Sequence, residues 1–338
     1  MPEKTKVPTM KDVAAEAGVA LGTVSKVFNG IPVGDDYRQK VEAAAKKLGY
    51  QVNAYARALK TNKTNTVALI LPTIHHPFFS AFAQYCGKAL QQRDYTLMLA
   101  TSDYDTNAEN NCISLVQQNK VAGIICLSYN PDFEVLGDIP FVSFDRYYGE
   151  GIPCVCSDNF GGGQLAASKL VENGCRKLLM LHEGSDVRGE PDKRELGFET
   201  YCKNHGIDYD MLIFHADHDW NNFWIYLDDH ITDGRLAYDG IFCGTDQLAY
   251  KTVLHLRTRG ISVPDDVQVI GFDGVRKFGT EDYYCSTIVQ PIEEIANKCV
   301  ELLLSDQKPA FAPLICLPVS YAYGGTTRDG SFVSHDCP

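Results

Sequence analysis

Short apolar runs of strand length alternate with helix-like stretches along residues 66–338, and no other feature constrains the fold as strongly. Strands that alternate with helices form parallel sheets, because each helix serves as the right-handed crossover that returns the chain to the next strand. We expect helices near residues 79–93 and 107–119. The expected strands are Val67–Leu71, Thr96–Ala100, Gly123–Leu127, Phe141–Phe144, Lys177–Leu181, Met211–Phe214, Gly240–Cys243 and Val267–Ile270.

The expected strands fall into two successive sets, which predicts two similar α/β lobes even though no strict internal repeat is present. In parallel sheets of this kind, ligands bind beyond the carboxyl ends of the strands. The body of the chain is therefore expected to hold a small molecule at these strand ends.

The first 65 residues differ from the body in charge. They contain eleven Lys and Arg residues against six Asp and Glu, which gives a net charge of +5. The whole chain carries −12, so the remainder carries −17. A small basic head on an acidic body is typical of a chain in which only the head contacts a polyanion, although a solvated basic face without a partner has the same charge.

The head has the pattern of three short helices. Thr9 and Asp12 form a T-x-x-D variant of the capping box before the first helix, and Gly18 stops it. A second helix is expected from Leu21 to Asn29 and a third from Asp35 to Leu48. Two short helices joined by a glycine-bearing turn are typical of a helix-turn-helix, whose second helix enters the major groove of DNA.

The second helix separates apolar from polar positions. Val24, Val27 and Phe28 lie on one stripe and are expected to face the small core. The opposite face offers a hydroxyl, an ammonium and an amide, all able to reach phosphates or base edges, with a glycine that permits close approach. The residues of this face are Gly22, Ser25, Lys26 and Asn29.

Sequence signatures give no support to an enzyme. The chain has no G-x-G-x-x-G, G-x-x-x-x-G-K-[ST], G-x-S-x-G or H-E-x-x-H motif, and Gly161–Gly163 suits a tight strand-to-helix turn. The pairs His75/His76 and His215/His218 lack a convincing set of further metal ligands. We therefore expect neither a cofactor nor a metal.

The twelve cysteines are scattered from Cys86 to Cys337 without a C-x-x-C pair. Cys154 and Cys156, the only close pair, would share one face of a strand. No apolar run reaches the length of a membrane span, and no apolar leader follows Met1. Reduced, buried thiols and a cytoplasmic location are the expectation.

The head closely resembles the DNA-binding headpiece of the lactose/galactose-repressor (LacI) family of bacterial regulators. The matching segments are Thr9–Ala14, Ala17–Val19, Thr23–Gly30 and Leu48–Tyr50. The resemblance implies a homodimer on a pseudo-palindromic operator. Besides the polar face above, it implies DNA contacts from Thr9, Lys11, Leu21, Thr23, Tyr50, Asn53, Ala56, Leu59 and Lys60.

Two positions of the head bear on how DNA is bound. Residues 56–60 match the family's hinge helix, in which Leu59 would take the role of the leucine that wedges into the minor groove and bends the duplex. The family usually places Ser or Thr at the start of the recognition helix, where this chain has Ala20. Loss of that cap costs about 1 kcal/mol of local stability, so DNA affinity is expected to be modest.

The resemblance covers almost the whole body as well. The matching segments are His76–Phe79, Phe144–Arg146, Asp158–Gly162, Arg194–Phe198, Cys243–Asp246, Val263–Val267, Ile270–Asp273 and Thr287–Pro291. It implies two Rossmann-like lobes resembling periplasmic sugar-binding proteins. The implied domains are a headpiece at 1–52, a hinge at 53–65, an N-lobe at 66–160 plus 292–320, a C-lobe at 161–291 and a C-terminal segment at 321–338.

By the same resemblance, the effector of this regulator would lie between the lobes. Guanidinium and carboxylate groups suit the hydroxyls of a sugar, and aromatic faces suit its ring. The implied effector residues are Phe78, Phe79, Ser128, Asp145, Arg188, Arg194, Trp220, Thr245, Asp246, Asp273 and Gln290. His218 is an alternative to Trp220.

The sequence therefore predicts a repressor of carbohydrate-utilisation genes controlled by a small sugar-like effector. Arg188, six residues before Arg194, leaves a purine or phosphorylated corepressor as an alternative, although Gly189–Pro191 departs from purine-binding relatives. A sugar-binding transport protein would fit the body but not the basic head.

Overall fold

The computed structural model describes residues 8–28, 30–50, 64–130, 139–148, 151–185, 187, 189–215, 220–305 and 312–328, and its contacts divide the chain into a unit at 1–64 and a unit at 65–338. None of the helices in these ranges combines the length and the apolar character required to cross a lipid bilayer.

The first unit contains three helices: α1 (Met10–Ala17), α2 (Leu21–Phe28) and α3 (Asp35–Leu48). The expected capping box is present, since the Thr9 side chain accepts from the Asp12 N–H while Asp12 accepts from the Thr9 N–H at 2.8 Å. Gly18 ends α1 with a φ of 63°, a left-handed conformation that glycine adopts without strain. The six buried core residues of this unit come from all three helices and are Val13, Ala14, Val24, Val41, Ala44 and Ala45.

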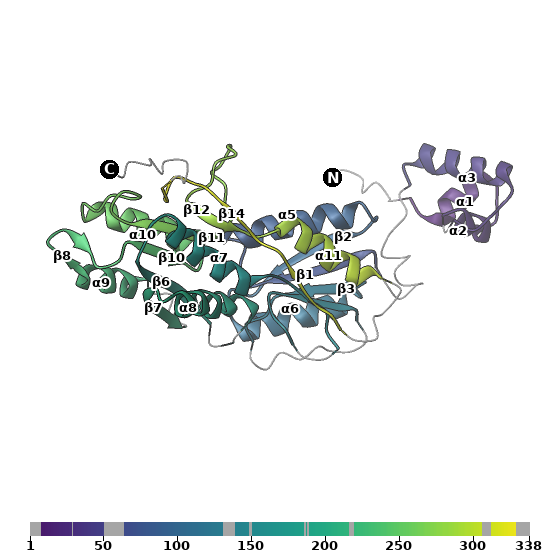
Figure 1. Cartoon of the computed structure of the whole chain (residues 1–338). Coiled ribbons are helices and arrows are strands. Elements are labelled where there is room, and N and C mark those ends of the chain that lie inside the picture. Colours follow the sequence, from purple (N-terminus) through teal and green to yellow (C-terminus); the bar gives the residue numbers. More distant parts are fainter. Residues whose placement is uncertain are drawn as a thin grey trace, which may run out of the picture. The chain divides into compact units, whose positions relative to one another are not determined.

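The second unit contains two six-stranded sheets, which confirms the expected α/β architecture (Figure 1). The first sheet has the order β13-β5-β4-β3-β1-β2 and is parallel throughout. Its strands are β1 (Thr66–Leu71), β2 (Thr96–Thr101), β3 (Gly123–Cys126), β4 (Phe141–Phe144), β5 (Cys154–Ser157) and β13 (Leu314–Leu317).

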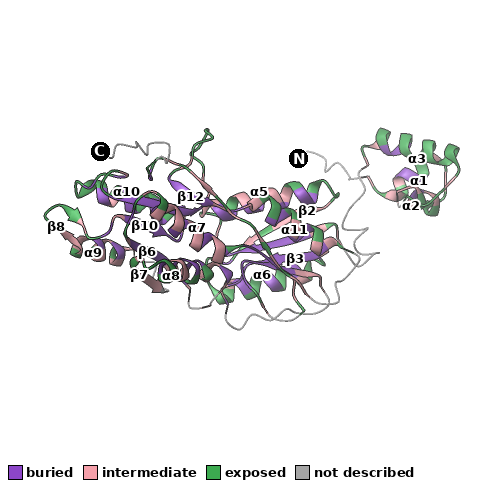
Figure 2. Cartoon of the chain, in the orientation of Figure 1, coloured by how far each residue is buried: buried purple, intermediate pink, exposed green. Residues whose placement is uncertain are grey.

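Alternating residues of the first sheet face different helices. Leu69 and Leu71 pack with α5 (Pro77–Gln91) and α11 (Ile292–Leu304), whereas Ala68 and Ile70 pack with α6 (Thr106–Gln118). Figure 2 shows the resulting layers, with buried strands between helices that are exposed on their outer sides. This arrangement explains why β1 is apolar at every position from Val67, because both of its faces are covered.

The second sheet has the order β14-β12-β11-β10-β6-β7, in which only β14 is antiparallel to its neighbour. Its strands are β6 (Lys177–Gly184), β7 (Asp208–His215), β10 (Gly240–Cys243), β11 (Gln268–Asp273), β12 (Ser286–Val289) and β14 (Ser320–Ala322). One face packs with α7 (Asn159–Glu172) and α8 (Lys193–His205), and the other with α9 (Asn221–Asp229) and α10 (Asp246–Thr258). Short elements complete this part: η1 (Glu190–Asp192), β8 (Ile231–Thr232) and β9 (Arg235–Leu236).

The chain passes three times between the two sheets. It leaves β5 of the first sheet for α7, leaves β12 of the second sheet for α11, and leaves β13 of the first sheet for β14. Residues 320–322 therefore add a strand to the second sheet, and Thr326 continues along its edge by donating from its hydroxyl to the Val269 carbonyl. The sequence analysis assigned residues 321–338 to a C-terminal segment without attaching that segment to either lobe.

The glycine run at 161–163 lies inside α7 and not in the turn that its sequence suggested. A Cβ on Gly163 would lie 2.1 Å from the Arg194 carbonyl oxygen, and a Cβ on Gly197 would lie 2.0 Å from the Phe160 carbonyl oxygen. The glycines therefore allow α7 and α8 to touch backbone to backbone. This close contact places the start of α8, with Arg194, beside the start of α7.

Candidate functional site

The described surface of α2 carries the polar groups expected to contact DNA. Val24 is fully buried, while Leu21, Gly22 and Lys26 are exposed. Thr23 and Ser25 are half-buried on the same helix, and Lys11 is exposed on α1. The split between the core stripe and the polar face is therefore as the helical spacing predicts.

Two expected DNA contacts of the head have structural partners within it. The Thr9 hydroxyl donates to Asp12 at 2.7 Å as part of the capping box, and the Tyr50 ring lies 5.4 Å from the Phe28 ring. Ala20, which has no side chain to cap α2, offers its carbonyl to the N–H groups of Thr23 and Val24. Asn29, Asn53, Ala56, Leu59 and Lys60 lie outside the described residues.

In the second unit, a cavity of about 430 Å³ lies at the carboxyl ends of strands from both sheets. From the first sheet's side it is lined by His76, Phe78, Phe79, Tyr104, Leu127, Tyr129, Asp145 and Arg146. From the second sheet's side it is lined by His182, Glu183, Gly184, Ser185, Val187, Gly189, Pro191, Asp192, Arg194, Trp220, Thr245, Gln247, Asp273 and Gln290. Its volume lies within the range of small-molecule sites.

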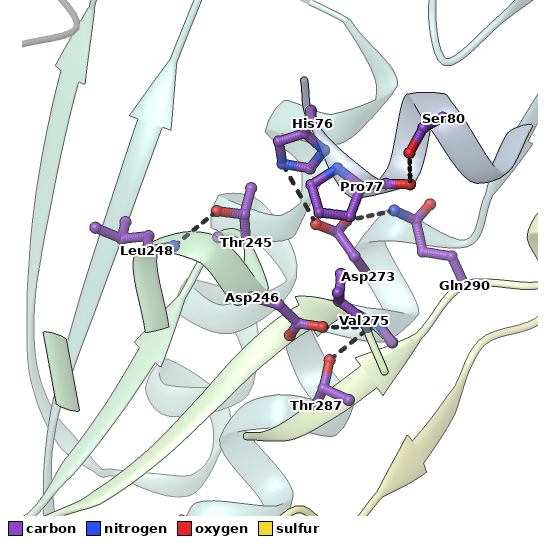
Figure 3. A network of polar contacts seen from close by, with 12 residues as sticks. His76, Pro77, Ser80, Thr245, Asp246, Leu248, Asp273, Val275, Thr287 and Gln290 are labelled. Atoms are coloured by element: carbon purple, nitrogen blue, oxygen red, sulfur yellow. Dashed lines mark hydrogen bonds and ion pairs between the residues drawn. The ribbon is translucent and has the colours of Figure 1, made fainter. Parts of the chain in front are cut away.

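Asp273, the last residue of β11, is at the centre of a polar network shown in Figure 3. Its Oδ1 accepts from Gln290 Nε2 at 2.7 Å, and its Oδ2 lies 3.8 Å from His76 Nε2. Oδ2 is buried and makes no hydrogen bond within the described part of the chain. Burial raises the pKa of Asp273, and the nearby His76 and Arg194 partly offset that rise.

Asp145 presents a second buried carboxylate to the cavity. It follows β4, has a φ of 54°, and among the described residues nothing hydrogen-bonds to its buried Oδ1. Burial raises its pKa to about 7, the Arg194 charge opposes the shift, and the Asp273 carboxylate adds to it. A buried acceptor without a partner costs free energy, so this oxygen is poised to accept from a ligand.

The Arg194 guanidinium interacts electrostatically with both carboxyl groups, and hydrogen bonds within the protein hold it in place. Nε donates to Asn159 Oδ1 at 2.8 Å and Nη1 donates to the Gly244 carbonyl at 2.7 Å. The guanidinium also lies 3.7 Å from the centre of the Phe272 ring. Arg194 is therefore held rigidly at the cavity wall.

Aromatic rings line the cavity on the sides of both sheets. Phe78 and Phe79 are buried at the start of α5 with their rings 5.6 Å apart. Trp220 lies against Lys251, whose Nζ is 3.9 Å from the ring centre, and its Nε1 donates to Glu183 at 3.2 Å. These surfaces suit the apolar face of a sugar ring.

Ser128 and Asp246, both expected to contact the effector, do not line the cavity. The Ser128 hydroxyl donates to Glu109 and accepts from the Asn130 N–H at 2.9 Å. Asp246 accepts from the Val275 N–H at 2.6 Å and contacts the Cys285 thiol. Internal hydrogen bonds thus engage both side chains, and neither residue is among those that line the cavity.

Thr245 and Gln290 line the cavity, but each also has an internal role. The Thr245 hydroxyl caps α10 by accepting from the Leu248 N–H at 3.2 Å. Gln290 accepts from the Ser157 hydroxyl at 2.7 Å in addition to its bond to Asp273. Arg188 lies outside the described residues, as does His218, the alternative to Trp220.

The structure adds lining residues that the sequence analysis did not select. They are His76, Tyr104, Leu127, Tyr129, Arg146, His182, Glu183, Gly184, Ser185, Val187, Gly189, Pro191, Asp192 and Gln247. His76 belongs to the quoted His76–Phe79 segment and could have been chosen on that signal. His182 had no such signal, and it reaches the cavity because its ring fills the space left by Gly244, where a Cβ would lie 1.8 Å from Nδ1.

The head and the body each match a known protein family. Residues 9–53 match the family described as bacterial regulatory proteins, lacI family, and residues 167–327 match the periplasmic binding protein-like domain. The sucrose operon repressor of Streptococcus mutans is 32% identical over 302 residues, covering 88% of this chain and 92% of that protein. The chain belongs to the lacI family of bacterial regulatory proteins.

Further relatives agree with the family. The ribose operon repressor of Halalkalibacterium halodurans is 30% identical over 330 residues, covering 95% of this chain and 98% of that protein. A periplasmic binding protein/LacI transcriptional regulator from Alkaliphilus metalliredigens, solved with D-xylulofuranose, has a TM-score of 0.68 at 30% identity. That comparison covers 79% of this chain and all of that one.

The lac repressor dimer, solved on its operator with the anti-inducer ONPF, has the same fold as this lacI-family chain. Its TM-score is 0.79 at 20% identity, covering 95% of this chain and 99% of that one. This lacI-family protein is thus a DNA-binding transcriptional regulator with a ligand-binding body.

Proposed function

We propose that this regulator represses a carbohydrate-utilisation operon in the bacterial cytoplasm, as a homodimer without enzymatic activity. A small neutral sugar in the described cavity is the effector that changes its affinity for operator DNA. The observation that carries the proposal is the pair of buried carboxylate oxygens beside aromatic walls, on Asp145 and Asp273, to which no described residue donates a hydrogen bond. Sugar hydroxyls supply donors of the required kind.

The charge of the cavity favours a neutral effector over a phosphorylated one. Among its described lining residues, four carboxylates (Asp145, Glu183, Asp192 and Asp273) stand against two guanidinium groups. Arg194 is bound to Asn159 and Gly244, and Arg146 donates to the Ser128 carbonyl. A phosphate would meet repulsion from the acids without an uncommitted guanidinium in this described set.

Tryptophan fluorescence provides the direct test of binding, because the chain has two tryptophans and only one of them, Trp220, is a described lining residue. Trp224 stacks on His255 with ring centres 5.1 Å apart. A panel of neutral mono- and disaccharides, one sugar phosphate and one purine base would be titrated into the wild type. We expect one neutral sugar to change the emission of the wild type and of Trp224→Phe, but not of Trp220→Phe.

Operator binding is tested with the sugar that the titration identifies. Fluorescence anisotropy of a labelled DNA fragment from upstream of the regulated genes should change its apparent Kd by about 5- to 150-fold on addition of that sugar. A response to the sugar phosphate or the purine alone would contradict the assignment of a neutral sugar. Emission changes that persist in Trp220→Phe and vanish in Trp224→Phe would place the ligand elsewhere.

A further inference from the structure

Two cysteines face each other across neighbouring strands, behind the wall of the cavity. Cys156 on β5 and Cys316 on β13 are register partners, although 160 residues separate them in the sequence. Their sulfur atoms lie 3.4 Å apart, and the Cys156 thiol also contacts Glu190 at 3.8 Å. Neither thiol has a role in the proposed effector site.

The backbone places these two thiols where a disulfide can form. Neighbouring strands lie about 4.8 Å apart, and disulfides span Cα separations of roughly 4.4–6.8 Å. In-register partners direct their side chains to the same face of the sheet, so only side-chain movement is needed to bring the sulfur atoms together. Cys154, on the same strand, is opposite Leu314 and has no thiol across from it.

The two thiols differ in exposure, as a reacting and a resolving cysteine would. Cys316 is exposed on the edge strand β13, where a small oxidant can reach it, and Cys156 is buried. The Lys193 ammonium binds Glu190 at 2.7 and 2.8 Å and interacts electrostatically with both sulfur atoms. Burial raises the pKa of the Cys156 thiol, so Cys156 keeps its proton until the second step.

Each cysteine of the pair lies one residue before the end of a first-sheet strand that leads to the second sheet. Cys156 immediately precedes Ser157, the last residue of β5, before the chain passes to α7 on the second sheet. Cys316 immediately precedes Leu317, the last residue of β13, before the chain passes to β14. The Asp158 N–H donates to the Leu317 carbonyl at 2.7 Å, so these two connections already run side by side.

We propose that Cys156 and Cys316 form a reversible intramolecular disulfide when the protein meets a peroxide. The disulfide joins β5 and β13 of the first sheet, one residue before each strand ends and its connection to the second sheet begins, and so restricts relative movement of the lobes. Neither cysteine is among the described residues that line the effector cavity. A transient, regulatory disulfide is the kind that a reducing compartment permits.

The reaction balances with hydrogen peroxide as the oxidant. The Cys316 thiolate attacks one peroxide oxygen, the O–O bond breaks, and the products are a Cys316 sulfenic acid and hydroxide. The Cys156 sulfur then attacks the sulfenic sulfur, the S–O bond breaks, and the Cys156 proton leaves with the departing hydroxide as water. Two thiols lose two electrons in total and one peroxide becomes two waters; a dithiol reductant reverses the bond by exchange.

Peptide mass spectrometry of the full-length protein tests the proposal. Reduced protein would be treated with hydrogen peroxide in the presence of EDTA, its remaining thiols alkylated, and the digest searched for cross-linked peptides. We expect a single main cross-link between 156 and 316 that dithiothreitol removes. Cys154→Ser, the matched control on the same strand, should give the same yield.

Variants of the pair separate the two chemical steps. Cys156→Ser should give no cross-link and should leave a sulfenic acid at Cys316 that dimedone traps, whereas Cys316→Ser should give neither product. Both thiols remaining alkylatable after peroxide treatment that oxidises other cysteines would overturn the proposal. A protein whose two thiols react only after EDTA has removed a bound metal would overturn it too, and would assign Cys156, Glu190 and Cys316 to that ion.

Hydrogen exchange measures the effect on the connections between the lobes. Oxidised wild type should exchange amides in segments 156–160 and 316–320 more slowly than reduced wild type, and its melting temperature should rise by about 5 °C. Peroxide-treated Cys316→Ser should show neither change. Equal exchange in oxidised and reduced wild type, with the cross-link present, would overturn the restriction of lobe movement.

Discussion

Gln290 donates from Nε2 to Asp273 Oδ1 at 2.7 Å, and through its Oε1 it accepts from the Ser157 hydroxyl at the same distance. Ser157 ends β5, Asp273 ends β11 and Gln290 directly follows β12, so one buried amide ties the last residue of a first-sheet strand to the carboxylate at the end of a second-sheet strand. Movement of the lobes and the position of Asp273 are therefore mechanically linked.

Replacing the Gln290 amide should lower the stability of the fold around Asp273. In Gln290→Ala, the buried Asp273 Oδ1 loses its donor, and an unsatisfied buried acceptor costs about 1–3 kcal/mol. We expect the free energy of unfolding, measured with urea, to fall by that amount. Gln247→Ala, at an exposed position of the cavity rim, serves as the matched control and should change it by less than about 0.5 kcal/mol.

The carboxylate itself should be needed for the effector. Asp273→Asn keeps the size of the side chain but removes the charge, and a charge-assisted hydrogen bond contributes about 1.5–3 kcal/mol. Effector affinity measured by calorimetry should fall by roughly ten- to a hundredfold, with operator binding unchanged. Asp229→Asn, on the exposed side of α9, should bind like the wild type. If Asp273→Asn retains wild-type affinity, this residue only supports the hinge.

Stability should depend on pH through Asp145. Its pKa of about 7 in the folded protein exceeds the 3.8 of an ordinary aspartate, so between these values the folded state holds a proton that the unfolded state has lost. Stability is then greatest near pH 4 and falls as pH rises towards 7, by about 4 kcal/mol for this group alone. Urea unfolding from pH 5 to 8 should show a smaller decline for Asp145→Asn than for the wild type. Parallel curves for the two proteins would contradict this assignment.

The contact between α7 and α8 should tolerate no side chain at its closest points. Gly197→Ala would force a Cβ against the Phe160 carbonyl and separate the helices that position Arg194. Overpacking of this kind costs about 1–3 kcal/mol, which a lower urea midpoint would record. Gly174→Ala gives no comparable test because its φ is 91°, whereas Gly87→Ala, in α5 with only a side chain 3.7 Å from the added atom, is a suitable control.

Two head variants should separate specific from general DNA binding. Lys26→Ala removes an exposed cation on α2, so the slope of log K against log salt should become shallower by about 0.9 for one lost phosphate contact.

Leu59→Ala should weaken binding to the operator more than to unrelated DNA, because it removes the proposed minor-groove wedge and leaves phosphate contacts in place. Equal losses on both DNAs would contradict the hinge assignment for Leu59.

Local sequence patterns determined the positions of elements that have a clear apolar run or a residue that starts or stops a helix. The Thr9–Asp12 capping box, the stop at Gly18 and the apolar runs of β1, β3, β4 and β10 all occur where the sequence placed them. Short strands with few large apolar residues were missed, namely β5, β8, β9, β12, β13 and β14, because each is held in place by pairing with neighbouring strands and not by an apolar pattern of its own. β6 and β7 also run further than expected, because residues 182–184 of β6 pair with 213–215 of β7, and residues 208–210 of β7 pair with 177–179 of β6.

Motifs identified the family and brought several of the residues that line the cavity to attention, but they could not tell which side chains face it. Asp246 and Thr245 are adjacent in one motif, yet Thr245 lines the cavity while Asp246 turns to the Val275 N–H. His76 and Asp273 meet at 3.8 Å only because tertiary packing brings the start of α5 to the end of β11, and Cys156 meets Cys316 only through the order of strands in the first sheet. Periodicity is a property of neighbouring residues along the chain, whereas the direction of a buried polar group is decided by the donors and acceptors that tertiary packing brings to it.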